Sequence, residues 1–503
     1  MSFANIDLIT RQTMDEVKSA IFKSVTTTGI TVGSGLQGYF LEDGAKLLRP
    51  VLSPWRNRLP RVKAPVGSLA ANWRAIVDIN AANADPSVGF GYPGPVLETT
   101  TENVSAPFQV LAEGNQVLMD AQILAQNWDD VRADTGTNTL YSLMIDEDKK
   151  LLGGQAFALQ TPAAAPTVAT ATTGGSIPAS TAVYMGYVAR GLNGYWFGGS
   201  SIRSANGTVT SGVGTTNTVT GTGTPVQGAV AYDWYAGSVS GTLYYFGTSA
   251  TPVSPVLKAI PTVDGALSPL PGLAPFVTWA SSSADSSANA NSINGLLPTM
   301  AGDYLNGGLV AHGTSGATPS GAYFTDLGGA QLTAVGGTMQ EIDAALINIW
   351  NNFNVSPTLM LVNAQQFKDI ANGAFATGGG RAIIPSDNPQ GRQGLTAGYT
   401  FDTYINPAVG GQRIEIMSEP HMPPGTIIGV SEVLPYPNSR VAQVMDVCTE
   451  LEYMQYEYGP SRVPGSSVGG PRWDFEVRAI EAFRNYFPAG CFAITGIGSG
   501  YQV

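Results

Sequence analysis

The chain has few charged residues and almost none of the side chains on which metal binding depends. Asp, Glu, Lys and Arg make up 12% of 503 residues, about half of the ~25% that is usual for soluble domains. There are two histidines, His312 and His421, and two cysteines, Cys448 and Cys491. A disulfide framework is therefore excluded, and no His/Cys group has the spacing of metal ligands. We expect no metal and no cofactor.

The sequence also lacks the positive charge and the long apolar runs that would indicate nucleic-acid or membrane binding. The formal net charge is −12, whereas proteins that hold nucleic-acid phosphates use clustered Lys and Arg. No apolar run approaches the ~18 residues of a membrane span, and Met1–Phe22 has no apolar centre of a secretory signal. We expect a protein of the reducing cytoplasm that neither enters a membrane nor holds DNA tightly.

The phosphate-binding loop of nucleotide hydrolases is missing as well. The sequence has no Walker motif. A Gly-x-Gly-x-x-Gly run, Gly33–Gly38, is present, but Pro50 and Pro54 interrupt the βαβ unit that a dinucleotide site requires. We expect no enzyme; a catalytic carboxylate pair stays open as an alternative, although no pair stands out.

The charged residues that are present are distributed unevenly. Residues 155–302 hold only six of the 62 charged residues in 148 positions, and the flanks hold the other 56. This predicts a module inserted into a host domain, whose two halves, 1–154 and 303–503, meet in space. Because the Ser/Ala/Asn-rich segment Ala280–Asn294 resembles a linker, we expect an autonomous module on the outer surface, able to fold when expressed as about Pro162–Pro261.

The insert has the pattern of an all-β domain. Short alternating runs, Thr181–Ala189, Ala229–Tyr235 and Thr242–Phe246, are separated by Gly and Ser at the spacing of a β-sandwich. Six aromatic residues are expected to form its core: Tyr184, Tyr187, Trp196, Tyr232, Trp234 and Tyr244. The runs around Ala182–Tyr187 and Val230–Gly237 resemble immunoglobulin-like or fibronectin type III domains. Carbohydrate binding by these aromatics is a second interpretation.

A proline-rich arm and a long hairpin are expected before the insert. Prolines 50, 54, 60 and 65 favour extended backbone over Leu48–Val66. Ala71–Ile79 and Val96–Val104 then alternate as two strands around a Gly-rich tip. An isolated two-stranded hairpin is marginal in water, so we expect it to contact a neighbouring subunit. The candidate contact residues are Trp73, Val77, Ile79, Glu98 and Glu102.

Two helices are expected between the hairpin and the insert. Pro107 is suited to a first helical turn, and an apolar stripe follows it to Trp128. A second helix is expected over Leu140–Leu152, ending at a Gly pair. Its acidic run, Asp146–Asp148, is interpreted as a solvated face and not as a metal site, because consecutive helical residues point in different directions.

The second half of the host contains a further helix and several strands. Thr338 and Glu341 predict a capping box, and the helix they begin ends before Pro357. Its buried apolar stripe is expected to be Ile342, Ala345, Leu346, Ile349 and Phe353. The strand Thr358–Val362 and a helix begun by Asn363 are expected next. Later strands are expected around Phe401–Ile405, Arg413–Met417, Thr426–Val430, Phe475–Ala482 and Phe492–Gly496.

This order of elements resembles the major capsid proteins of tailed bacteriophages. The resemblance covers nearly all of the host, about 350 residues, and includes the segments Asp146–Gly154, Asn354–Val362, Glu419–Ile428 and Trp473–Phe483. It implies an α+β capsid fold with an inserted immunoglobulin-like sandwich. The expected parts are an N-terminal arm (1–59), an E-loop hairpin (60–106), a spine helix with the first part of a P-domain (107–154), the insert (155–302), the second part of the P-domain (303–377), an A-domain (378–470) and closing core strands (471–503).

The resemblance also implies a function. Such proteins assemble as pentamers and hexamers into an icosahedral shell around packaged double-stranded DNA, in the cytoplasm of a host bacterium. The implied partners are other copies of the chain, a portal protein and a separate scaffolding protein. Family members that cross-link covalently use an E-loop Lys, and Ala64–Ala106 contains none, so cross-linking is not expected. The alternative function is a surface adhesin or phage tail protein whose immunoglobulin-like module binds carbohydrate.

Overall fold

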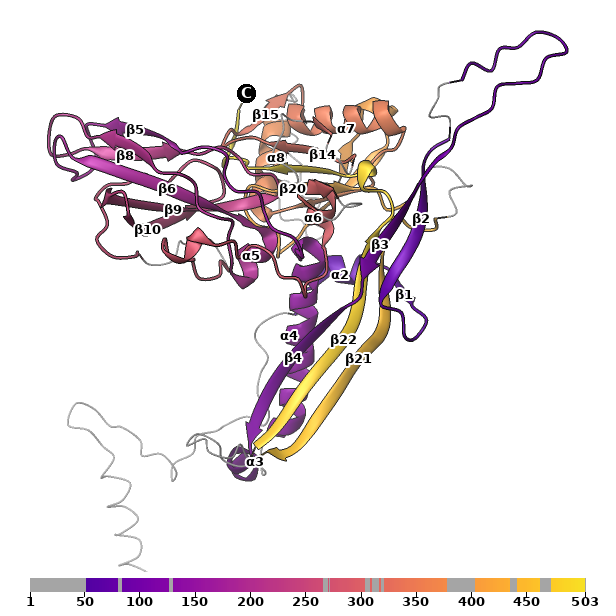
Figure 1. Cartoon of the computed structure of the whole chain (residues 1–503), viewed down its shortest axis with the longest axis horizontal. Helices are drawn as coiled ribbons and strands as arrows, with labels where there is room; N and C mark the ends of the chain where they lie inside the picture. Colours follow the sequence, from indigo (N-terminus) through magenta and orange to yellow (C-terminus); the bar gives the residue numbers. More distant parts are fainter. Residues whose placement is uncertain are drawn as a thin grey trace, which may run out of the picture.

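The protein is an α+β molecule with a broad body, a long narrow sheet below it and a hairpin that projects from their junction (Figure 1). The computed structural model describes residues 51–79, 84–125, 130–265, 270, 272–303, 308–309, 316–317, 321–377, 403–434, 441–461 and 472–502. The Gly33–Gly38 run, most of the predicted arm and the start of the predicted A-domain lie outside these residues. Within the described part, no helix is both long and apolar enough to cross a membrane.

A seven-stranded mixed sheet forms the host part of the body. Its strand order is β13-β14-β23-β20-β17-β19-β18. The strands are β13 (Gly316–Ala317), β14 (Tyr323–Asp326), β23 (Phe492–Thr495), β20 (Ile427–Val430), β17 (Leu359–Val362), β19 (Arg413–Ser418) and β18 (Thr403–Ile405). All four residues of β17 are buried, as expected for a central strand covered on both faces. The predicted strands of the second half are confirmed.

Two helices pack on this sheet, α7 (Gln340–Phe353) and α8 (Ala364–Thr377). The predicted apolar stripe of α7 is buried, but its predicted capping box is wrong. Thr338 lies in the short strand β16 (Thr338–Met339), which pairs with β15 (Leu332–Val335), so its backbone belongs to a β-ladder. The Glu341 carboxylate instead accepts a hydrogen bond from the Thr333 amide at 3.0 Å. A tight strand pair therefore begins this helix in place of a side-chain cap.

The long sheet has the order β1-β21-β22-β4 and lies beside the helix α4 (Val131–Gly153) (Figure 1). Its strands are β1 (Arg61–Lys63), β21 (Met445–Ser461), β22 (Arg472–Asn485) and β4 (Gln109–Leu118). The boundary predicted at 470/471 separates β21 from β22, although these two strands form one hairpin. Residues 445–461, which were predicted to belong to the A-domain, therefore form part of the long sheet beside α4.

The helix predicted from Pro107 to Trp128 is wrong. Pro107 ends a strand, and β4 pairs with β22 in continuous antiparallel register from Gln109↔Glu481 to Leu118↔Arg472. Only the short helix α3 (Met119–Ala125) follows. Gly114 in the middle of this segment disfavours a helix, and β22 supplies ladder partners that local periodicity cannot reveal. The long helix of this region is α4, which begins after the N-cap Asp130, ten residues before the predicted start at Leu140.

The proline-rich segment is not extended throughout. Pro54–Arg58 forms the helix α2, with Pro54 at its start and Trp55 buried. Proline in the first turn loses no helical hydrogen bond, so its presence permits this short helix. The following strand β1 pairs in parallel with β21. The described part of the predicted arm is therefore built into the host.

The insert contains two antiparallel sheets. A four-stranded sheet has the order β10-β9-β6-β7, and β5 pairs with β8. The strands are β5 (Thr167–Ala171), β6 (Ala182–Gly191), β7 (Gly207–Thr210), β8 (Thr218–Thr222), β9 (Ala229–Val239) and β10 (Thr242–Ser249), with helix α5 (Leu192–Phe197) after β6. The predicted β-structure of the insert is confirmed. Its relationship to immunoglobulin-like domains stays a prediction.

The core of the insert includes three of the predicted aromatics and one ion pair. Tyr187, Tyr232 and Trp234 are fully buried, and Tyr187 stacks on Trp234 with ring centroids 5.0 Å apart. Tyr184, Trp196 and Tyr244 are only half-buried. The Arg190 guanidinium donates to Asp233 at 2.6 Å, with both side chains fully buried. Two of the six charged residues of the insert thus neutralise each other inside it.

The segment Ala280–Asn294 is packed and is not a free linker. It contains the 3-10 helix η1 (Ser281–Ser283), and Ser282, Ser292 and Ile293 are buried. The Asn289 amide donates to the Gln155 carbonyl at 3.0 Å. Host and insert residues belong to one hydrophobic cluster, in which Leu151 and Leu152 of α4 join Leu192 of the insert. The composition of this segment is misleading, because serine and asparagine are common in flexible linkers and also form hydrogen bonds in packed, tight turns.

The remaining elements connect these layers. They are the hairpin strands β2 (Ala70–Asp78) and β3 (Thr100–Pro107), helix α6 (Leu296–Ala301), the strands β11 (Gly302–Asp303), β12 (Gly308–Leu309) and β24 (Tyr501–Gln502), and the 3-10 helices η2 (Pro407–Val409) and η3 (Pro488–Gly490).

Candidate assembly interface

The projecting element is an antiparallel hairpin, as predicted. β2 and β3 pair from Ala70↔Pro107 to Asp78↔Thr100, and residues 84–99 continue beyond the ladder as irregular extended backbone. A register shift occurs between Ile76 and Asp78. Such an irregularity adds a residue to one strand and breaks its two-residue alternation. The regular two-residue alternation predicted over Ala71–Ile79 is therefore interrupted between Ile76 and Asp78.

The base of the hairpin is attached to the long sheet. Ala71 packs in a small buried cluster with Ala64 and Cys448. The Ala64 amide donates to the Thr449 carbonyl at 2.8 Å, and the Gly67 amide donates to the Glu450 carboxylate at 2.7 Å. The chain therefore holds one end of the hairpin firmly within its own fold.

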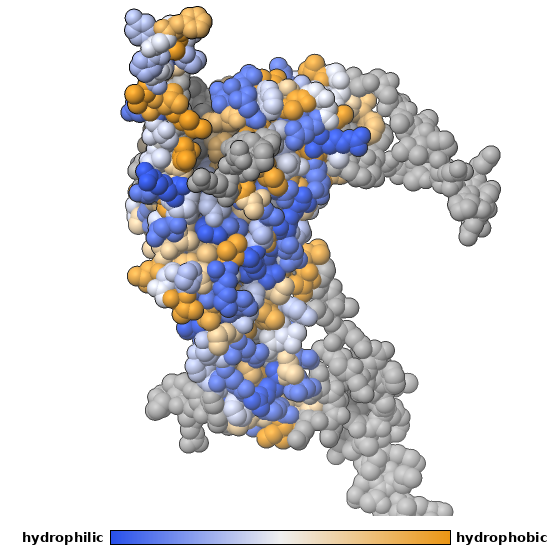
Figure 2. Space-filling model, turned by 90° about the vertical axis from the view of Figure 1, so that its right-hand side faces the viewer, coloured by the Kyte–Doolittle hydropathy of each residue, from blue (hydrophilic) through white to orange (hydrophobic). Residues whose placement is uncertain are grey.

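Beyond this base, large apolar side chains are exposed to solvent. Phe90 is fully exposed, at 108% of the reference value, and Val96 is 92% exposed. Figure 2 shows hydrophobic residues along the upward projection at the top of the molecule. The exposed apolar residues beyond the base are Ile76, Ile79, Val88, Phe90, Tyr92, Val96 and Leu97, and Val66 and Leu69 are exposed at the base itself. Gathered exposed apolar side chains of this kind mark interaction surfaces.

The predicted contact residues have different positions. The Trp73 ring meets Tyr486 of the same chain edge-on, with centroids 5.2 Å apart, so part of this residue packs within its own subunit. Ile79 is 68% exposed, and Glu98 is also exposed. Val77 and Glu102 lie in the hairpin strands, but their side chains are outside the described set. Sequence reasoning missed Phe90, Tyr92 and Val96 as contact residues. The signal in the sequence was the presence of large apolar residues within a Gly/Pro-rich tip, which has no core to bury them.

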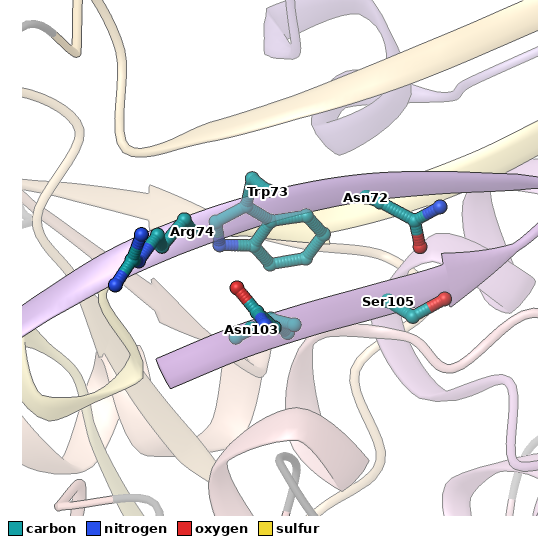
Figure 3. A pocket seen from close by; sticks show the side chains of 6 residues that line it. Asn72, Trp73, Arg74, Asn103 and Ser105 are labelled. Carbon is teal, nitrogen blue, oxygen red and sulfur yellow. The ribbon is translucent and has the colours of Figure 1, made fainter. Parts of the chain in front are cut away.

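A shallow groove of about 470 Å³ lies on the hairpin beside Trp73. It is lined by residues of both strands, and Figure 3 shows the Trp73 ring on β2 next to the Asn103 side chain on β3. The Arg74 guanidinium donates to the Thr101 hydroxyl at 2.7 Å across the same pair of strands. The groove offers an apolar ring between polar groups, a combination typical of a protein contact.

A second exposed apolar region lies on the long sheet and at its far end. Met454, Tyr456 and Tyr458 are exposed on β21, at 43%, 36% and 47%. On α3, Ile123 and Leu124 are 67% and 82% exposed. The sequence analysis missed the α3 part of this region, because the predicted helix through Val110–Trp128 placed Leu124 on its apolar stripe.

Buried charges hold α2 and β1 against α4 and thereby fix the hairpin base. Arg56 donates to the Glu147 carboxylate at 2.7 Å, and Arg61 also pairs with Glu147. Arg61 further donates to Glu481 at 3.2 Å. Burial and the nearby Glu147 charge raise the pKa of Glu481 to about 8. Glu147 is therefore not on a solvated helix face, because α4 is covered by α2 and the sheet.

Comparisons with known proteins give distant structural similarities. No family model matches the chain, and no curated protein sequence matches it. The capsid of the native GTA particle is similar with a TM-score of 0.41 and 8% identity, covering 92% of this chain and 95% of that one. The cyanophage Pam1 capsid gives 0.38 and 9% identity, over 94% and 100%. The holo-SrpI encapsulin complex from Synechococcus elongatus gives 0.37 and 9% identity, over 92% and 94%.

Proposed function

We propose that this chain is a major capsid protein, a structural protein that assembles as pentamers and hexamers into an icosahedral shell. The observation that carries the proposal is the projecting hairpin, whose base is fixed in the fold while seven large apolar residues beyond it are exposed. Leaving those side chains in water forgoes about 25 cal/mol per Å² of apolar area that a neighbouring subunit could cover. A role in assembly accounts for that arrangement.

The exposed side of the long sheet and α3 supports the same proposal. A closed shell needs each subunit to present different surfaces to different neighbours, since rotational rings use heterologous contacts. The hairpin and the α3 end lie at opposite ends of the molecule (Figure 1). Two separated apolar surfaces suit a subunit with neighbours in two directions.

The proposed shell encloses double-stranded DNA without holding it tightly. The net charge of −12 opposes strong attraction to phosphate. In this proposal the chain acts in the virion and is assembled in the cytoplasm of a bacterial host, with a portal protein and a separate scaffolding protein as further partners. The role is structural and needs no catalytic centre.

The alternative of a carbohydrate-binding adhesin or tail protein has less support. Sugar-binding aromatics must present a ring face to the ligand, whereas Tyr187, Tyr232 and Trp234 of the insert are fully buried. No observation on the insert favours the alternative.

Electron microscopy and analytical ultracentrifugation of the purified full chain test the proposal. We expect closed shells, or rings of five and six subunits, at concentrations where assembly is complete. A protein that stays monomeric across solution conditions, with or without co-expressed scaffold, would overturn the proposal.

A further inference from the structure

A buried cluster of three potential metal ligands lies where the host meets the insert. Asp148 comes from α4, while Glu419 and His421 come from the turn after β19. The side chains of Asp148 and Glu419 are 0% exposed, and that of His421 is 12% exposed. Their ligand atoms all lie within 4.8 Å of one another. Asp148 is 271 positions from Glu419 and 273 positions from His421 in the sequence, so their meeting depends on the tertiary fold.

One oxygen of this cluster has no hydrogen-bond partner within the described part of the chain. Glu419 Oε1 accepts from the His421 amide at 3.2 Å, but Glu419 Oε2 is buried and unpartnered. Asp148, in contrast, uses both oxygens: Oδ1 accepts from the Arg56 amide and Oδ2 contacts His421 Nδ1, each at 2.6 Å. A buried carboxylate oxygen normally has a hydrogen-bond partner or a bound cation. The unpartnered Oε2 of Glu419 therefore indicates that a cation from outside the chain binds here.

The turn that carries Glu419 and His421 is held rigidly. The Glu419 amide donates to the Val362 carbonyl at 2.9 Å, and Asn363 donates through its side chain to the Met422 carbonyl at 2.6 Å. The His421 carbonyl accepts from Trp196 Nε1 at 3.0 Å. Ligands fixed by surrounding hydrogen bonds lose little entropy when an ion binds, as in established metal sites.

The distances are close to those that a small divalent ion requires. His421 Nδ1 lies 2.6 Å from Asp148 Oδ2 and 3.4 Å from Glu419 Oε1. Ligands about 2.0–2.2 Å from a tetrahedral ion are about 3.3 Å from one another. A movement of less than about 1 Å between Asp148 and His421 would satisfy this geometry.

The charge of the cluster also favours a cation. The other nearby cations are occupied: Arg56 pairs through its guanidinium with Glu147, and Lys149 pairs with Asp146. Two buried carboxylates therefore share one imidazole.

We propose that Asp148, Glu419 and His421 bind one divalent transition-metal ion of the Zn²⁺ class, which joins α4, the β19 turn and the inserted domain. One imidazole nitrogen and two carboxylate oxygens form a donor set suited to Zn²⁺, with water as the fourth ligand. The ion would replace the proton on His421 Nδ1 and neutralise both carboxylates. This site revises the expectation of no metal, which was based on sequence spacing, and it does not depend on the proposed assembly.

The site has a structural consequence for the insert. Trp196 of α5 donates to the His421 carbonyl and meets the His421 ring edge-on, with centroids 6.0 Å apart. Orienting His421 by metal coordination therefore also orients the surface on which the insert rests. We expect a bound ion to stabilise the host–insert junction.

The test uses the full chain, treated with chelator, dialysed and titrated with Zn²⁺ or Co²⁺ at neutral pH. We expect saturation at one ion per chain, a rise in Tm, and visible Co²⁺ absorption bands of a four-coordinate site. Glu419→Gln and His421→Gln should each weaken Zn²⁺ binding by at least about a hundredfold, more than changes outside the ligand shell cost. Glu415→Gln is the matched control, because it removes an exposed carboxylate from β19, the strand that precedes the turn with Glu419 and His421. This variant should bind Zn²⁺ as the unmodified chain does.

Two outcomes would overturn the site. One is the absence of saturable Zn²⁺ or Co²⁺ binding to the unmodified chain, in which case a proton on His421 alone balances the carboxylates. The other is stoichiometric binding that Glu419→Gln and His421→Gln leave unchanged. The Co²⁺ spectrum of the unmodified chain keeps the test decisive even if a variant does not fold.

Discussion

The body and the hairpin of this protein contain similar apolar residues, but these side chains are buried in the body and exposed in the hairpin. In the body, Leu151, Leu152 and Met300 are fully buried in a cluster that spans host and insert. In the hairpin, Phe90, Val96 and five further large apolar residues are exposed. The body completes its own core, whereas the hairpin has too few layers to do so, because a two-stranded sheet has no second layer to cover it.

The comparison separates folding from association. Apolar area buried within the body contributes to the free energy of unfolding of the single chain, while apolar area on the hairpin contributes only when another molecule covers it. Substitutions in the two regions should therefore change different measurements, and each experiment below compares the two regions.

The largest expected effect comes from removing the hairpin tip. Replacing residues 79–99 with Asn-Gly joins Asp78 to Thr100, which already pair, through a favoured two-residue turn. We expect a folded chain with a Tm within about 2 °C of the original, since surface changes remote from the core cost little, but no shells by electron microscopy. Val213→Ser, which changes an 87% exposed residue of the insert, should assemble normally. Normal shells from the tip variant would falsify the role of the hairpin.

The second effect concerns how far the insert folds alone. The predicted fragment 162–261 omits Phe276 and Trp279, which cover a second cluster of the insert: Phe276 stacks on Tyr245 with centroids 4.2 Å apart. We expect residues 156–292 to show a cooperative thermal transition by circular dichroism. The shorter fragment should melt broadly, because its largest aromatics lose their cover. Equal cooperativity of the two fragments would mean that residues 262–292 only connect the insert to the host.

A smaller effect distinguishes the base of the hairpin from its tip. Trp73 is half-buried against Tyr486, so Trp73→Ala should lower the free energy of unfolding of the isolated chain by about 1–3 kcal/mol. Phe90→Ala, at a fully exposed position, should change it by less than about 0.5 kcal/mol but lower the temperature at which shells dissociate. Denaturant titration of chains and light scattering of particles measure the two effects. Equal losses of chain stability in the two variants would contradict the distinction.

The smallest effect is a pH dependence at the edge of the long sheet, where Glu113 lies on β4. Burial, with a hydrogen bond to Asp146, raises the pKa of Glu113 to about 7 from 4.5. The stability that its proton contributes is complete below about pH 4.5 and is lost as pH rises through about 7. Glu113→Gln should therefore melt a few degrees higher than the unmodified chain above pH 7, and the difference should shrink toward pH 4.5. A difference in Tm that is constant over this range would show that Glu113 does not titrate there.

Local patterns predicted much of the second half of the host and the hairpin. The stripe of α7 and the apolar strand β17 were predicted correctly because their own side chains determine burial. The helix expected over 107–128 was wrong because the partner of β4, β22, lies more than 350 residues later in the chain. The cluster of Asp148, Glu419 and His421 could not be predicted either, since His421 and Asp148 are 273 residues apart in the sequence.

The sequence by itself determined the α+β class, the low-charge all-β insert and the hairpin, because periodicity and composition act over neighbouring residues. Only the tertiary structure decided which acidic residues of α4 are buried. Only the fold, too, could show that Ala280–Asn294 packs into the body, and that the apolar residues of the hairpin tip stay exposed. Burial and ion pairing depend on elements from distant parts of the chain, and a local pattern is the same whether or not a partner covers it.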